Sequence, residues 1–236
     1  MKERHTAGKR SPIMLATPKG GAVPAADALT PGGAVFGLTC GQFSLLDLVR
    51  ALLDRTGPAD VRISTWSTGI CDAEAAKWLI TSGGITRLRL YTDRSFPTRQ
   101  PTYAAALVGM FGEQSIVCTD VHAKIACISG GDWRIVVRSS MNLNKNPRFE
   151  QYDIDDNPAM FDFVSAWLDE LDRLAPHGFV FSHAESEIAF RDALTSGIHA
   201  DDAVEAMTGA KAAPPKPKKA AKKKPLRVEC PIRRMG

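Results

Sequence analysis

The sequence has few cysteines and no long apolar run, and these absences exclude several classes of protein. Cysteine occurs five times in 236 residues, at the scattered positions 40, 71, 118, 127 and 230. Such cysteines favour a reducing, cytoplasmic setting, where a buried thiol behaves as a small hydrophobe. No apolar stretch approaches the roughly 20 residues that cross a bilayer, and no apolar core follows Met1–His5 as it would in a secretory signal. We therefore expect a cytoplasmic protein without a membrane span.

Signatures of metal centres and nucleotide loops are also missing. Cys118, His122 and Cys127 are zinc ligands by type, but they lack the short paired spacing of a compact zinc site. Lys124 would also place a cation beside them. The glycine pairs at 83–84 and 130–131 do not precede Lys-Ser or Lys-Thr at the spacing of a phosphate-binding loop. We expect neither a metal nor a cofactor.

Positive charge is concentrated at the two ends of the chain. The net charge is +4, but residues 211–236 carry seven Lys and three Arg against one Glu. Residues 1–33 carry five basic and two acidic side chains, whereas 34–210 carry 15 basic and 23 acidic ones. This asymmetry predicts tails that contact a polyanion around an acidic folded body. We interpret 1–33 as a flexible basic segment and 211–236 as a Lys/Pro/Ala-rich tail.

The tail composition is typical of segments that bind nucleic acid by neutralising phosphates. A solubilising tail without a specific partner is the alternative. The lysines expected to contact phosphate are Lys218, Lys219, Lys222, Lys223 and Lys224.

Hydrophobic periodicity between the tails alternates between strand and helix. Strands are expected over residues 34–39, 61–66, 85–91, 115–118, 122–128, 133–137 and 152–154, and helices over 43–54, 72–82, 101–111 and 159–174. This order predicts an α/β domain over 34–180 with a mixed sheet flanked by helices. Residues 181–210 are expected to form a helical extension, and Asp153, Asp155 and Asp156 a solvated loop.

Five polar residues at the ends of two apolar strands carry the chemistry. His122 and Lys124 are two residues apart and would share one strand face, and so would Ser140 and Asn142 if extended. A neutral imidazole can attack an electrophile near neutral pH. Glu150 could orient that imidazole, while the lysine, hydroxyl and amide donate to an oxyanion. Such a set can transfer a phosphoryl group without a metal. Trp66, Ser67 and Thr68 could line the same cleft or simply pack.

The pattern His-x-Lys, then Ser-x-Asn, then Glu resembles the HKD motif of the phospholipase D superfamily, most closely over about residues 118–156. The resemblance implies a phospholipase D-like fold and phosphodiester hydrolysis through a phosphohistidine intermediate. His122 would be the nucleophile, Lys124, Ser140 and Asn142 would bind phosphate, and Glu150 would orient His122. Ser129 and Ser139 stand where that motif has aspartate and glycine.

No second His-x-Lys occurs in the sequence. The single motif resembles short members of the superfamily, in which two chains pair to bring two motifs together. We therefore expect a homodimeric phosphodiesterase, an endonuclease acting on DNA or RNA. The Ser129 and Ser139 departures motivate an alternative, a catalytically degenerate nucleic-acid-binding protein. A phospholipid phosphodiesterase is the third possibility.

Overall fold

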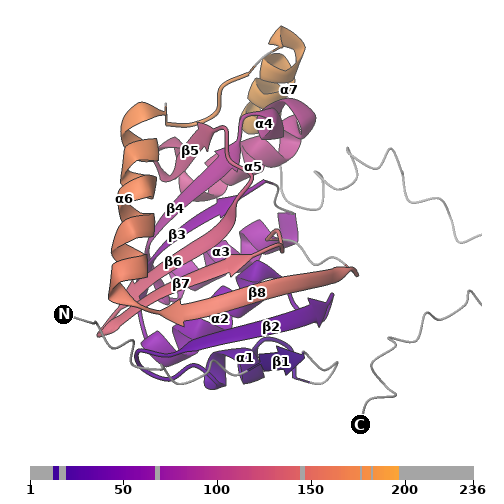
Figure 1. Cartoon of the computed structure of the whole chain (residues 1–236). Coiled ribbons are helices and arrows are strands. Elements are labelled where there is room, and N and C mark those ends of the chain that lie inside the picture. The colour runs from indigo at the N-terminus through magenta and orange to yellow at the C-terminus, as the bar shows by residue number, and fades with distance from the viewer. Residues whose placement is uncertain are drawn as a thin grey trace, which may run out of the picture.

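A mixed eight-stranded sheet forms the centre of the protein (Figure 1). The structure is a computed structural model, and it describes residues 13–15, 20–66, 70–143, 147–175, 177–181 and 183–196. The strands lie in the order β1-β2-β8-β7-β6-β3-β4-β5. Their bounds are β1 Ile13–Leu15, β2 Ala34–Cys40, β3 Ala59–Thr65, β4 Ile85–Asp93, β5 Ile116–Thr119, β6 Lys124–Gly130, β7 Trp133–Ser139 and β8 Phe149–Asp156.

Helices cover both faces of this sheet. They are α1 Val23–Asp27, α2 Leu45–Thr56, α3 Ile70–Thr81, α4 Ser95–Arg99, α5 Pro101–Phe111, α6 Pro158–Leu174 and α7 Ala184–Thr195, with a short 3-10 turn at Glu113–Ser115. In Figure 1, α6 runs along one face, and α2 and α3 lie on the other. On the α6 face, Val164 and Leu168 pack with Tyr91, Val117 and Val136. The predicted α/β class with a mixed sheet flanked by helices is confirmed.

Helix α2 shows how local sequence positions the elements. Ser44 accepts a hydrogen bond from the Asp47 backbone N–H at 3.2 Å, and the Asp47 carboxylate accepts one from the Ser44 N–H at 2.9 Å. This reciprocal capping box satisfies two amides at the helix start. The leucines and valine that follow form the apolar stripe that the sequence predicts. All of that stripe is buried in the main core: Leu45, Leu46, Leu48, Val49, Leu52 and Leu53.

Strand directions bring many chain ends to one side of the sheet. Strands β3, β4 and β5 are parallel, whereas β6 and β8 run against their neighbours. Consequently β2, β3, β4, β5 and β7 end where β6 and β8 begin. We call this side the carboxyl edge.

Two expectations about polar segments are wrong. Within 1–33, which the sequence suggested was flexible, α1 is a helix whose Ala25 and Ala26 are buried in the main core. The acidic residues expected in a solvated loop belong to β8 instead. There Asp156 is buried and accepts hydrogen bonds from the Gly32 N–H at 2.8 Å and the Arg134 N–H at 2.9 Å. These two backbone donors supply the partners that a buried carboxylate requires.

The C-terminal predictions are reached only in part. Helix α7 lies where the helical extension over 181–210 was expected, and residues 197–236, including the five tail lysines, lie outside the described residues. None of the helices in the described ranges combines the length and apolar character that a bilayer crossing requires.

Candidate active site

His122 and Lys124 meet at the carboxyl edge. Lys124 is the first residue of β6 and only 9% exposed, whereas His122 lies exposed in the irregular segment before it. The Lys124 Nζ lies 3.0 Å from His122 Nδ1 and 3.4 Å from Nε2. Because an ammonium can only donate, this contact requires a lone pair on the ring nitrogen. A neutral imidazole satisfies that requirement.

The backbone reaches this contact differently from the sequence expectation. A strand over 122–128 would have put both side chains on one face by alternation. Strand β6 instead begins at Lys124, so His122 lies outside the ladder. The irregular segment before β6 and the contacts with Lys124 and Trp66 therefore position the imidazole.

Ser140 and Glu150 form a second pair beside the first. Ser140 directly follows β7, and its hydroxyl donates to the Glu150 carboxylate. The Gln151 N–H donates to Ser140 Oγ at 3.0 Å, which fixes the hydroxyl against β8. Lys124 pairs with Ser139 in the sheet register, so the Ser140–Glu150 pair follows directly beyond the strand position opposite Lys124.

Burial and charge act oppositely on Lys124. Desolvation lowers the pKa of this ammonium below its ordinary value, and the nearby Glu150 carboxylate raises it in part. A buried cation with incomplete compensation binds an anion well, because the anion restores the lost interactions.

Asn142 lies two residues after Ser140, in the loop that follows β7. Its backbone carbonyl accepts a hydrogen bond from the Leu45 N–H at 3.3 Å, which links this loop to the start of α2. Its side-chain Oδ1 is buried and accepts no hydrogen bond from the described residues. A buried oxygen without a donor is costly, so a ligand or solvent donor would find a ready partner here.

His122 also has an aromatic neighbour. The Trp66 ring, directly after β3, lies 5.6 Å from the imidazole centroid at an interplanar angle of 50°. The Arg99 guanidinium carbon lies 4.1 Å from the Trp66 ring centroid. Sequence reasoning considered Trp66 only as a cleft or packing residue and missed Arg99, whose five-residue helix shows no periodic pattern. Ser67 and Thr68 lie outside the described residues.

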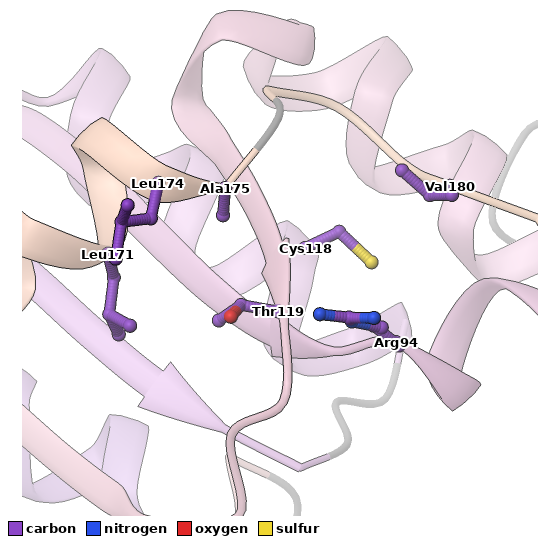
Figure 2. A pocket seen from close by; sticks show the side chains of 7 residues that line it. All are labelled: Arg94, Cys118, Thr119, Leu171, Leu174, Ala175 and Val180. Carbon is purple, nitrogen blue, oxygen red and sulfur yellow. The ribbon is translucent and has the colours of Figure 1, made fainter.

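A pocket of about 380 Å³ opens near the ends of β4 and β5 (Figure 2). Arg94, Cys118 and Thr119 line it from the sheet side, while Leu171 and Leu174 line it from α6. Burial raises the pKa of the Cys118 thiol, so this group remains protonated at neutral pH. The pocket therefore offers one cation and apolar walls rather than a nucleophile.

No cluster of three or more histidine, cysteine or carboxylate side chains suited to a metal ion occurs within the described ranges. Cys118, Cys127 and His122 belong to separate environments. Cys127 packs in the core beneath α6, where burial raises the pKa of its thiol to about 12. The cation next to His122 is the Lys124 ammonium, whose Nζ lies 3.0 Å from His122 Nδ1.

No protein-family model and no curated protein sequence matches this chain. Several solved structures are similar to it, among them the following three. NucT from Helicobacter pylori is 18% identical, with a TM-score of 0.44 over 62% of this chain and 99% of NucT. Nuc from Salmonella typhimurium, a phospholipase D family member, is 14% identical, with a TM-score of 0.41 over 63% of this chain and 99% of Nuc.

The third is phosphatidylserine synthase from Haemophilus influenzae Rd KW20, which is 10% identical, with a TM-score of 0.43 over 75% of this chain and 44% of the synthase. The chain's own topology gives the fold class: an α/β protein with a mixed sheet, at whose carboxyl edge His122, Lys124 and Ser140 lie.

Proposed function

We propose that this chain is a phospholipase D-like phosphodiesterase that cleaves nucleic acid through a phosphohistidine intermediate without a metal. The observation that carries the proposal is the contact of Lys124 Nζ with His122 Nδ1 at 3.0 Å, beside the Ser140–Glu150 pair. It joins a nucleophile, a cation and hydrogen-bond donors at one exposed edge. Phosphoryl transfer needs this combination, because its catalysis is mostly positioning and charge stabilisation.

In the first step, a ring nitrogen of His122 forms a bond to phosphorus while the bond from phosphorus to the leaving oxygen breaks. The leaving oxygen takes a proton from a second, protonated imidazole. Water then attacks the phosphohistidine, gives its proton to that second imidazole, and releases a phosphate monoester. Lys124 and Asn142 stabilise the phosphoryl oxygens. Ser140 joins them when its hydroxyl turns from the Glu150 carboxylate to the substrate, and Glu150 then orients the imidazole.

The second imidazole is the His122 of another copy of the chain. Two other histidines, His177 and His183, lie in the described ranges. Neither is part of a helix or strand that ends beside His122. Sedimentation equilibrium should therefore give twice the 25.5 kDa mass of the chain. A monomer with full activity would contradict the two-copy site.

The basic tail supports nucleic acid as the substrate. Seven lysines and three arginines against one glutamate in 211–236 would hold a polyanion next to an otherwise acidic body. The alternative, a binder that does not cleave, uses the same phosphate-contacting groups.

The two serines that depart from the motif, Ser139 and Ser129, both have defined places in the structure. Ser139 accepts from the Met141 N–H at 2.9 Å and donates to the Gln151 carbonyl at 2.7 Å, so it shapes the loop. Ser129 pairs with Asp60 and Arg134 toward the opposite edge of the sheet, away from Lys124.

The test is incubation of the purified protein with single- and double-stranded DNA in excess EDTA. His122→Ala should abolish cleavage, and His183→Ala, an exposed histidine before α7 without a side-chain cap bond, should retain it. Acid-labile phosphate on the wild-type protein would identify the intermediate. Cleavage by His122→Ala at the wild-type rate would refute the mechanism. Binding without cleavage would favour the binder, and turnover of anionic phospholipid vesicles alone would favour the lipid substrate.

A further inference from the structure

Arg99 is a cation beside the candidate nucleophile that the proposed reaction does not use. Its guanidinium stacks on Trp66 at 4.1 Å, and the other neighbour of that ring is the His122 imidazole at 5.6 Å. Arg99 and His122 therefore share the Trp66 indole as a common neighbour. Arg99 is exposed, so its charge faces solvent at the same edge as the reacting groups.

The structure holds this arginine in place at two points. Its Nε donates to Ser95 Oγ at 3.0 Å. Ser95 is fixed in turn by Asp93, whose carboxylate accepts from the Ser95 N–H at 2.9 Å and from the Ser95 hydroxyl. Because Asp93 ends β4, the anchor belongs to the sheet itself. A long side chain held in this way loses little entropy when it binds a ligand.

The anchoring uses the face and the Nε edge of the guanidinium. Stacking on an aromatic ring leaves the in-plane N–H donors of an arginine pointing outward. Two parallel N–H groups match two oxygens of a phosphate. Arg99 therefore suits a second phosphate next to the one held at Lys124, because both sites border Trp66.

We propose that Arg99 binds the phosphate adjacent to the scissile one, so that the site selects a polynucleotide strand over a diester with a single phosphate. This inference rests on the proposed function. Lys124 and His122 act on the reacting phosphate, Trp66 borders both subsites, and Arg99 sets the preference for a substrate that continues past the cleaved bond. Arg99 is a specificity-determining residue in this scheme.

The experiment separates the two subsites with two probes. Turnover of bis(p-nitrophenyl) phosphate, which has one phosphate, reports the proposed chemistry. Calorimetric binding of a phosphorothioate dithymidine, with terminal phosphates at both ends or at neither, reports the Arg99 subsite. In the full-length protein, the terminal phosphates should strengthen binding about tenfold, as a charge-assisted pair does.

Arg99→Gln should remove this preference and leave turnover of bis(p-nitrophenyl) phosphate unchanged. Arg99→Lys should retain part of it, and Ser95→Ala should weaken it by loosening the anchor. Arg87→Gln is the matched control, since Arg87 is an exposed arginine toward the other end of β4 and should keep the full preference.

A preference that persists in Arg99→Gln, or is absent from the wild type, would overturn the Arg99 proposal even if the diester is hydrolysed. A preference that depends on Arg99, in a protein that hydrolyses no diester, would keep the phosphate subsite and refute only the catalytic function.

Discussion

At the scale of single residues, Lys124 makes the site sensitive to alkaline pH. Burial lowers the pKa of this ammonium, so it loses its proton at a lower pH than an ordinary lysine, whose pKa is about 10.4. We expect kcat/KM to fall as the pH rises toward that value, because the neutral amine no longer holds phosphate. A pH profile of DNA cleavage measures this. Lys124→Arg keeps its positive charge at alkaline pH, so substrate binding by this variant should not weaken as the pH rises. If kcat/KM of the variant falls at the same alkaline pH as that of the wild type, Lys124 is not the group responsible.

At Gly37 the packed structure leaves no room for an added methyl group. A Cβ at this position would overlap the ring of Tyr152, which is 1% exposed and belongs to the pairing strand β8. Because overpacking of a filled core is costly, Gly37→Ala should lower the free energy of unfolding by about 3 kcal/mol. Urea unfolding gives the value.

Gly109→Ala is the control for this change. Gly109 lies in α5, where an added Cβ meets no atom within 4 Å, so the substitution should stabilise by about 0.5 to 1 kcal/mol through helix propensity. Equal effects at the two glycines would contradict the packing argument.

At the scale of elements, helix α6 is tied to the sheet by a polar network. Arg62 on β3 donates to Tyr91 Oη at 2.6 Å and pairs with Asp169 at 2.7 Å and Asp172 at 3.3 Å. The Tyr91 hydroxyl donates to Asp172 at 3.0 Å. Burial raises the pKa of Tyr91 to about 12, so the phenol stays a donor throughout the physiological range.

Arg62→Met should remove the donor to Tyr91 Oη and one of the two arginines that pair with Asp172, the other being Arg89, and so destabilise the fold by about 2 kcal/mol. Thermal unfolding would show a lowered Tm. Arg173→Met, which removes an exposed arginine paired with Glu170 on the same helix, should leave the Tm unchanged. If both variants unfold at the wild-type temperature, α6 is held by its apolar face alone.

The elements also show what sequence reasoning can reach. Helix α5 occupies the predicted residues 101–111, because Pro101 starts it and apolar residues fill its faces. Helix α4 was missed, since five residues with a central Pro97 carry no period. Strand β8 was predicted too short. In this strand Tyr152, Ile154 and Asp156 alternate as buried residues. An aspartate in a sequence is normally interpreted as solvent-exposed, and only the structure reveals the two backbone donors that allow Asp156 to be buried.

The same limit applies to the site. The motif resemblance named five residues, and the structure brings His122 to Lys124 and Ser140 to Glu150. Arg99 could not be found in this way, because its partner Trp66 is more than 30 positions away along the chain. Contacts between distant segments depend on register, and no local pattern encodes them.

At the scale of the whole molecule, the basic tail should govern affinity rather than chemistry. Removal of residues 211–236 eliminates ten basic side chains and one acidic one. We expect weaker DNA binding and a flatter dependence of the logarithm of affinity on the logarithm of salt concentration, because fewer counterions are released. Fluorescence anisotropy across a salt series measures the slope. An unchanged slope would make the tail a spacer.

The central position of β6 has a consequence for how the protein opens. This strand lies between β3 and β7, has the main core on one face and α6 on the other, and begins with Lys124. Sheets lose protection first at their outer strands, here β1 and β5, and last at their centre. Amide hydrogens of β6 should therefore exchange among the slowest in the molecule. Local unfolding would break the hydrogen bonds of the edge strands while β6, the strand that carries Lys124, remains paired with its neighbours.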